Sequence, residues 1–133
     1  MGKALAAFLP AAQRERALPG LVFQPVTRRT IRNSAEFQKE LLKIHRRGYA
    51  LDNEESVPGA RCVAAPIVNA RNEAVAAISV SGPVARITND KIPMFATAIK
   101  KAVRTIAEQM GFTGQPPGRV RAGRNEGRRA GDY

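Results

Sequence analysis

The sequence predicts an α+β fold, in which an antiparallel sheet is flanked by helices. Two apolar runs, 62–68 and 74–81, alternate in the manner of strands, and the five residues between them are rich in turn formers, which is typical of a β-hairpin. A longer run over 92–110 has apolar residues at helical spacing, which predicts an amphipathic helix packed on the sheet. The 133 residues amount to about one domain.

Ahead of the hairpin, residues 2–9 and 10–18 are expected to form two short helices. Pro10 suits the first turn of the second helix, because the N–H that it lacks would be unpaired there in any residue. Pro19 and Gly20 end this helix. Residues 21–32 are then expected to form an irregular or extended connection.

A third helix is expected to begin at Asn33 and to end at Gly48. The Asn33 side chain can cap the free N–H groups, and Glu36, three residues later, gives the pattern of a capping box. The apolar residues at positions 37, 41 and 44 share one helix face. Gly48 suits the left-handed residue that ends many helices.

The strands form the last part of the prediction. A short strand is expected over 49–52, followed by a loop and by the hairpin strands 62–68 and 74–81, the second of which Gly82 and Pro83 stop. Two or three strands are few for such a sheet and leave its edges open. We therefore expect other strands or a partner chain to complete it.

The charge is strongly basic, with 22 Lys and Arg against 11 Asp and Glu, a net of +11. Residues 113–133 carry a net of +3 and almost no apolar residues, so they are expected to form a disordered basic tail. This tail can bind nucleic acid weakly through phosphate contacts, or it is simply solvated. Its five arginines are Arg119, Arg121, Arg124, Arg128 and Arg129. Elsewhere the positive charge favours an anionic partner or serves solubility alone.

The chain lacks the residues that several classes of function require. Cys62 is the only cysteine and His45 the only histidine, which leaves no disulfide framework and too few ligands for a cysteine-based metal site. Neither a catalytic triad nor a metal set can be assembled, so we expect no enzyme activity and no cofactor. No apolar run is long enough to span a membrane, and a cytoplasmic location is expected.

A candidate binding site lies on the hairpin. Ser79 and Ser81 share one face of their strand, about 7 Å apart, and Cys62 joins them if the register brings it alongside. Hydroxyls above small, alanine-lined walls suit a small organic acid. The pattern alone leaves other interpretations open: the serines face water, Cys62 is a small buried hydrophobe, and Asp52 belongs to a solvated acidic loop.

Three motifs resemble the effector-binding domain of IclR-type transcription regulators. They are G-Y-A-L-D-N-E-E at 48–55, P-G-A-R-C-V-A-A-P-I at 58–67 and A-A-I-S-V-S-G-P at 76–83. Gly2-Lys3-Ala4 is similar to a helix start of that family, and Arg86-Ile87 to an element that follows the last motif. The resemblance covers about residues 2–111.

The resemblance implies an incomplete GAF-like domain over 1–112 that senses a small-molecule effector, such as a carboxylic acid, and controls transcription. The family's pocket residues correspond to Asp52, Cys62, Ser79 and Ser81. Self-association or pairing with another IclR-type subunit is implied, and DNA would be reached only through a helix-turn-helix domain that this chain does not contain. The alternative is a truncated oligomerisation module that pairs with full-length regulators through its exposed sheet edge.

Overall fold

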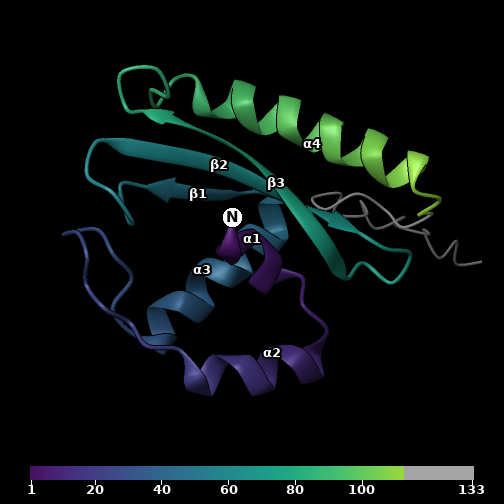
Figure 1. Ribbon diagram of the computed structural model, residues 1–133, viewed down its shortest axis with the longest axis horizontal. Coiled ribbons are helices and arrows are strands. Elements are labelled where there is room, and N and C mark those ends of the chain that lie inside the picture. Colours follow the sequence, from purple (N-terminus) through teal and green to yellow (C-terminus); the bar gives the residue numbers. More distant parts are fainter. Residues whose placement is uncertain (113–133) are drawn as a thin grey trace, which may run out of the picture.

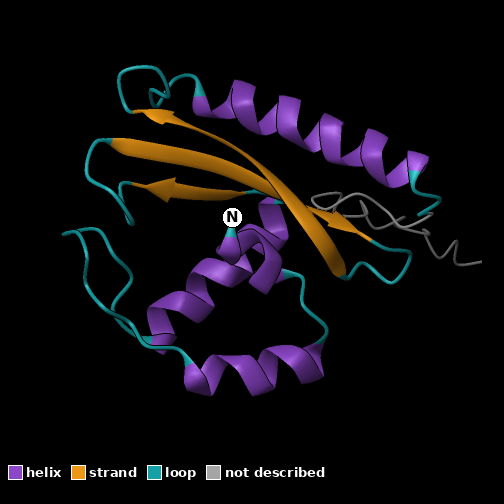
Figure 2. Ribbon diagram, in the orientation of Figure 1, coloured by secondary structure: helices purple, strands orange, loops and turns teal. Residues whose placement is uncertain are grey.

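The computed structural model describes residues 1–112, in which a three-stranded antiparallel sheet, in the order β1-β2-β3, has helices on both faces (Figures 1 and 2). The expected α+β class is confirmed. The strands are β1 (Ala50–Asn53), β2 (Ala60–Val68) and β3 (Ala74–Pro83). The helices are α1 (Gly2–Ala7), α2 (Ala11–Ala17), α3 (Ser34–Arg47) and α4 (Ile92–Gln109), with a short 3₁₀ turn, η1 (Leu18–Gly20), after α2.

The central strand β2 divides the core into two halves. Its alternate side chains point to opposite sides of the sheet, and both sides are covered, so all residues from Val63 to Val68 are buried. Ala64 and Val68 belong to the core beneath α1 and α3. Val63, Ala65 and Ile67 belong to the core beneath α4.

The α1 and α3 side is built from small residues and a few large ones. Ala4 and Ala7 of α1 are buried, which lets this short helix approach the sheet closely. Leu41 and Ile44 of α3 pack into the same cluster, as their helical spacing predicts. Phe8 fills the remaining space, and its carbonyl oxygen accepts a hydrogen bond from the backbone N–H of Ala74, 2.8 Å away.

The opposite face is covered by α4, which lies across the sheet (Figure 1). Ala96, Ile99 and Val103 are buried against β2, so the expectation that this apolar stripe is core is confirmed. The helix ends one residue earlier than the sequence predicted. Gly111 follows with a φ of 77°, the left-handed conformation that glycine adopts without strain.

The start of α3 differs from the expected capping box in one contact. The Asn33 side chain accepts the N–H of Glu36 at 2.9 Å, as predicted. The Glu36 carboxylate, however, accepts the N–H of Arg32 at 3.2 Å and not that of Asn33. It therefore orders the residue before the cap. At the other end Gly48 has a φ of 80° and closes the helix as expected.

The strand boundaries move by one or two residues. β1 begins at Ala50 and not at position 49, and β3 continues through Gly82 and Pro83, which the sequence had suggested as its stop. Both residues still pair with β2, opposite Arg61 and Ala60. A proline is tolerated at the end of an edge strand, because it can point its missing donor away from the ladder. The expected basic tail, 113–133, lies outside the described residues.

Candidate ligand-binding site

The four residues expected to form a pocket lie on one face of the sheet. Asp52 of β1 is directly opposite Cys62 of β2, and Cys62 is directly opposite Ser81 of β3. These three residues form a row across all three strands. Ser79 lies one step along, opposite Ala64. The expected neighbourhood of Cys62 and the two serines is therefore present, with Ser81 as the direct partner and Ser79 as the diagonal one.

Helices cover only part of this face. Ala50 and Ala64 are buried beneath α1 and α3, at 2% and 1% exposure. Asp52 and Cys62 are half-buried, whereas Ser79 and Ser81 are exposed. The row thus runs from a partly covered end at β1 to an open end at β3. Along it stand a carboxylate, a thiol and a hydroxyl, beside small apolar side chains.

The Asp52 carboxylate is held by the loop that follows β1. One of its oxygens, Oδ1, accepts the backbone N–H of Glu55 at 2.8 Å, and the other, Oδ2, accepts the hydroxyl of Ser56 at 2.6 Å. The loop is thereby tied to the end of the strand. Because each carboxylate oxygen can accept more than one hydrogen bond, Asp52 keeps the capacity to accept one from a ligand.

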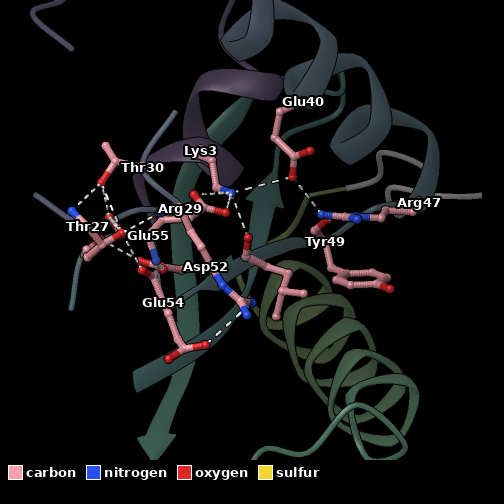
Figure 3. A network of polar contacts seen from close by, with 12 residues as sticks. Lys3, Thr27, Arg29, Thr30, Glu40, Arg47, Tyr49, Asp52, Glu54 and Glu55 are labelled. Atoms are coloured by element: carbon pink, nitrogen blue, oxygen red, sulfur yellow. Dashed lines mark hydrogen bonds and ion pairs between the residues drawn. The ribbon is translucent and has the colours of Figure 1, made fainter. Parts of the chain in front are cut away.

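Two threonines from a distant part of the chain form hydrogen bonds with the same loop (Figure 3). The hydroxyls of Thr27 and Thr30 donate to the backbone carbonyls of Glu54 and Glu55, both at 2.7 Å. Glu54 has a φ of 59°, an uncommon conformation for a residue with a side chain, so these bonds offset a local strain. The segment 21–32, which gave only an irregular prediction, is therefore part of the support of the site.

Lys3 is the functional-site neighbour that sequence reasoning missed. Its ammonium group donates to the carbonyl oxygen of Leu51 at 2.7 Å and to the carboxylate of Glu55 at 2.8 Å. It also lies 3.5 Å from Glu40 of α3 (Figure 3). The Lys3 side chain is only 13% exposed. It thus connects α1 to the residue that donates to Asp52.

The ion pairs continue from Glu40 to Arg47, whose guanidinium lies 3.0 Å from the carboxylate. Arg47 also donates to the carbonyl oxygen of Tyr49 at 2.7 Å and stacks on the ring of Tyr49, 4.7 Å from its centre. Basic and acidic groups alternate in this series of ion pairs, which helps to hold the side chains in place. The only sequence signal was the Gly2-Lys3-Ala4 similarity, which indicated a helix start and no ion pair.

Two hollows occur on another part of the surface. One of about 510 Å³ lies between α2 and α3, among residues that include Arg14, Gln38 and His45. Another, of about 310 Å³, lies between α1, α2 and the start of α3 and is almost wholly apolar. Neither is lined by the row on the sheet. The polar groups of the row, in contrast, lie together on one face of the sheet.

The described part of the chain has no cluster of three or more metal-ligating side chains. His45 stacks on Phe8, with ring centres 4.7 Å apart. No helix of the described residues is long and apolar enough to cross a membrane.

Comparison with known proteins gives a consistent result. The family model described as bacterial transcriptional regulator IclR C-terminal matches residues 1–108. The HTH-type transcriptional regulator BhcR of Paracoccus denitrificans is 39% identical over 80% of this chain and 38% of its own length. The crystal structure of the Thermotoga maritima IclR matches with a TM-score of 0.78 and 35% identity, over 84% of this chain and 45% of that one.

A second similar structure shares the fold at lower identity. It is the inducer binding domain of PobR from Acinetobacter, in complex with 3-hydroxybenzoic acid, with a TM-score of 0.67, 21% identity, and coverage of 82% of this chain and 61% of that one. The chain spans about two fifths of the length of the curated relatives that it matches.

Proposed function

Because this chain belongs to the IclR C-terminal family of bacterial transcriptional regulators, we propose that its sheet binds a small carboxylic acid as an effector at Asp52, Cys62, Ser79 and Ser81. Domains of this family are the ligand-binding part of transcription regulators. The observation that carries the proposal is the row Asp52–Cys62–Ser81, which the strand register brings onto one face.

The chemistry of the row suits a small anion. The hydroxyls of Ser79 and Ser81 can rotate to donate to a carboxylate, and their exposure leaves them free to do so. Neighbouring strands lie about 4.8 Å apart, so the row from Asp52 to Ser81 spans about 10 Å, the length of a small organic molecule. Cys62 in the middle offers a small polarisable contact to its carbon atoms.

Asp52 determines the orientation of the ligand. A carboxylate ligand is repelled by the like charge of Asp52, so its acid group lies at the serine end of the row. A carboxylate accepts hydrogen bonds and donates none, so Asp52 selects a hydroxyl or another donor on the far end of the ligand. The loop bonds from Glu55 and Ser56 fix the carboxylate in place before the ligand arrives.

Control of transcription follows if ligand occupancy favours one arrangement of a longer regulator over another. That effect requires different ligand affinities in the two arrangements. Ser79 and Ser81 lie on β3, which is also the open edge of the sheet. A bound ligand can therefore affect the part of this domain that another segment would contact. In this proposal, another domain of such a longer regulator contacts the DNA.

The experiment is isothermal titration with a panel of small mono- and dicarboxylic acids, which includes 3-hydroxybenzoic acid because a structural neighbour holds it. At least one acid is expected to bind, and the Ser79→Ala/Ser81→Ala double variant is expected to weaken it about tenfold or more, as two lost hydrogen bonds to a charged group imply. Ser34→Ala, at an exposed position on α3, is the matched control. No binding by any acid, or equal binding by the double variant, overturns the proposal.

A further inference from the structure

Of the cations that form ion pairs within the described residues, Lys3 is the least exposed. Its side chain is 13% exposed, against 31% for Arg47 and 53% for Arg29. Removal of an ammonium group from water is unfavourable unless hydrogen bonds and opposite charges compensate for it. Lys3 has both kinds of compensation, and together they fix the position of its ammonium group.

The Lys3 ammonium group holds the chain on both sides of Asp52 (Figure 3). Its first acceptor, at 2.7 Å, is the carbonyl oxygen of Leu51, which belongs to the peptide group that leads directly into Asp52. Its second acceptor, at 2.8 Å, is the carboxylate of Glu55. The backbone N–H of Glu55 in turn donates to Oδ1 of Asp52, also at 2.8 Å. One side chain of α1 therefore holds both the residue before Asp52 and the residue that binds its carboxylate.

The charges beside Asp52 balance only when Lys3 is present. The cations of this group are Lys3 and Arg47, and the carboxylates are those of Glu40 and Glu55. Without Lys3 the group would have a net charge of −1, next to the further negative charge of Asp52. The Glu55 side chain is only 20% exposed, and a carboxylate without its cation gains free energy by moving toward water. That movement would pull the Glu55 N–H away from Asp52.

We propose that Lys3 is a positioning residue for the effector. By holding the backbone on both sides of Asp52, it directs this carboxylate toward the far end of the ligand. Lys3 thereby sets the selectivity for acids that carry a hydrogen-bond donor at that end. The inference rests on the proposed function, because it requires the ligand to lie along the row. Loss of Lys3 should therefore affect the donor end of the ligand and leave its acid end, at the two serines, unchanged.

Pairs of acids that differ only in one hydroxyl group separate the donor end of the ligand from its acid end. The pairs are 3-hydroxybenzoic acid with benzoic acid, and 6-hydroxyhexanoic acid with hexanoic acid. The measured quantity is the ratio of the two dissociation constants within a pair, obtained by isothermal titration of the 133-residue chain. An unfolded fraction weakens both acids of a pair by the same factor, so this ratio does not respond to a loss of stability alone.

The original protein should bind the hydroxy acid more tightly than its parent acid in at least one pair. Lys3→Met should reduce this preference about tenfold, as the loss of one hydrogen bond to a charged group implies, while the affinity for the parent acid stays nearly the same. Lys3→Arg keeps a positive charge and several donors, and should restore part of the preference.

Two further variants separate positioning from a general structural role. Glu55→Ala removes the same contact from its other side and should reduce the preference by a similar factor, and the Lys3→Met/Glu55→Ala variant should reduce it no further. The matched control is Lys100→Met. Lys100 is a half-buried lysine of α4 whose ammonium group donates to the carbonyl oxygen of Arg47, on the opposite side of the sheet from α1. Its loss should leave the preference unchanged.

An undiminished preference in Lys3→Met overturns the inference, and the proposed function then stands if Ser79→Ala/Ser81→Ala still weakens both acids. A preference that falls equally in Lys100→Met also overturns it, because the effect would then come from a general loss of structure. If neither hydroxy acid binds the original protein better than its parent acid, the inference fails, while the proposed function is still decided by the wider panel of acids and the serine variant. If Lys3→Met does not fold, Glu55→Ala decides by the same criterion.

Discussion

Cys62 of β2 lies directly opposite Ser81 of β3, on the sheet face that α1 and α3 only partly cover. The two side chains share that face because both strands keep their alternation through this region, and the register irregularity occurs further along, between Ile67 and Val68. A slip of β3 by one residue would send Ser81 to the α4 side, while Cys62 stayed on its own face. The buried residues of β2 therefore fix the register on which the proposed site depends.

The first prediction concerns the loop contacts of Asp52. Asp52→Ala removes the acceptor of the Glu55 N–H and of the Ser56 hydroxyl, and should lower the free energy of unfolding by about 1–3 kcal/mol. Asp52→Asn keeps one carbonyl oxygen for the Glu55 N–H and should lower the free energy of unfolding by about half as much. Urea denaturation of both variants measures the difference. An Asp52→Ala protein as stable as the original would contradict the structural role of this carboxylate.

The second prediction concerns Lys3. Lys3→Met keeps the length of the side chain but leaves the Leu51 carbonyl and the Glu55 carboxylate without their shared donor, and should lower the free energy of unfolding by about 1–3 kcal/mol. The control, Lys43→Met, changes an exposed lysine of α3 and should stay within about 0.5 kcal/mol. Equal effects of the two substitutions would show that the half-buried ion pairs of Lys3 contribute nothing specific.

Much of the fold could be predicted from local signals. The hairpin, the Asn33 cap, the Gly48 helix end and the stripe of α4 each depend on residues close together in the sequence. Part of the site could be predicted for the same reason, because alternation along one strand places Ser79 and Ser81 on one side. Cys62 could join them only through the register between two strands, which the sequence left conditional.

The contacts that escaped prediction join distant parts of the chain. Lys3 meets Glu55 across 52 positions, and Thr30 meets the Glu55 carbonyl across 25. A lysine at the start of a helix and a threonine in an irregular segment are ordinary in composition, so no pattern marks their partners. The direction of the Glu36 carboxylate, toward Arg32, was missed because both possible donors lie within its reach.

The third prediction concerns the start of α3. Asn33→Ala removes the side-chain acceptor of the Glu36 N–H and should lower the free energy of unfolding by about 1 kcal/mol. Asn33→Asp, which keeps an acceptor oxygen at the same place, should retain nearly full stability. Thermal unfolding followed by circular dichroism distinguishes the two. A melting temperature unaffected by Asn33→Ala would mean that the cap is not required.

The fourth prediction concerns the core beneath α1 and α3. Ile44 is fully buried, and Ile44→Ala should lower the free energy of unfolding by about 2–5 kcal/mol through lost burial and the resulting cavity. Leu42, on the same helix, is 60% exposed, so Leu42→Ala should lower the free energy of unfolding far less. Urea denaturation measures both. Similar costs for the two substitutions would be incompatible with the packing of α3 on the sheet.

The proposed binding of a small acid on the sheet is tested most directly by alkylation of Cys62, because this residue is the only cysteine and lies in the middle of the row. An acid that raises the melting temperature should slow the reaction of Cys62 with iodoacetamide in proportion to its occupancy. The protection should disappear in the Ser79→Ala/Ser81→Ala variant. An acid that stabilises the protein while Cys62 reacts at its original rate would place the ligand elsewhere and contradict the proposed site.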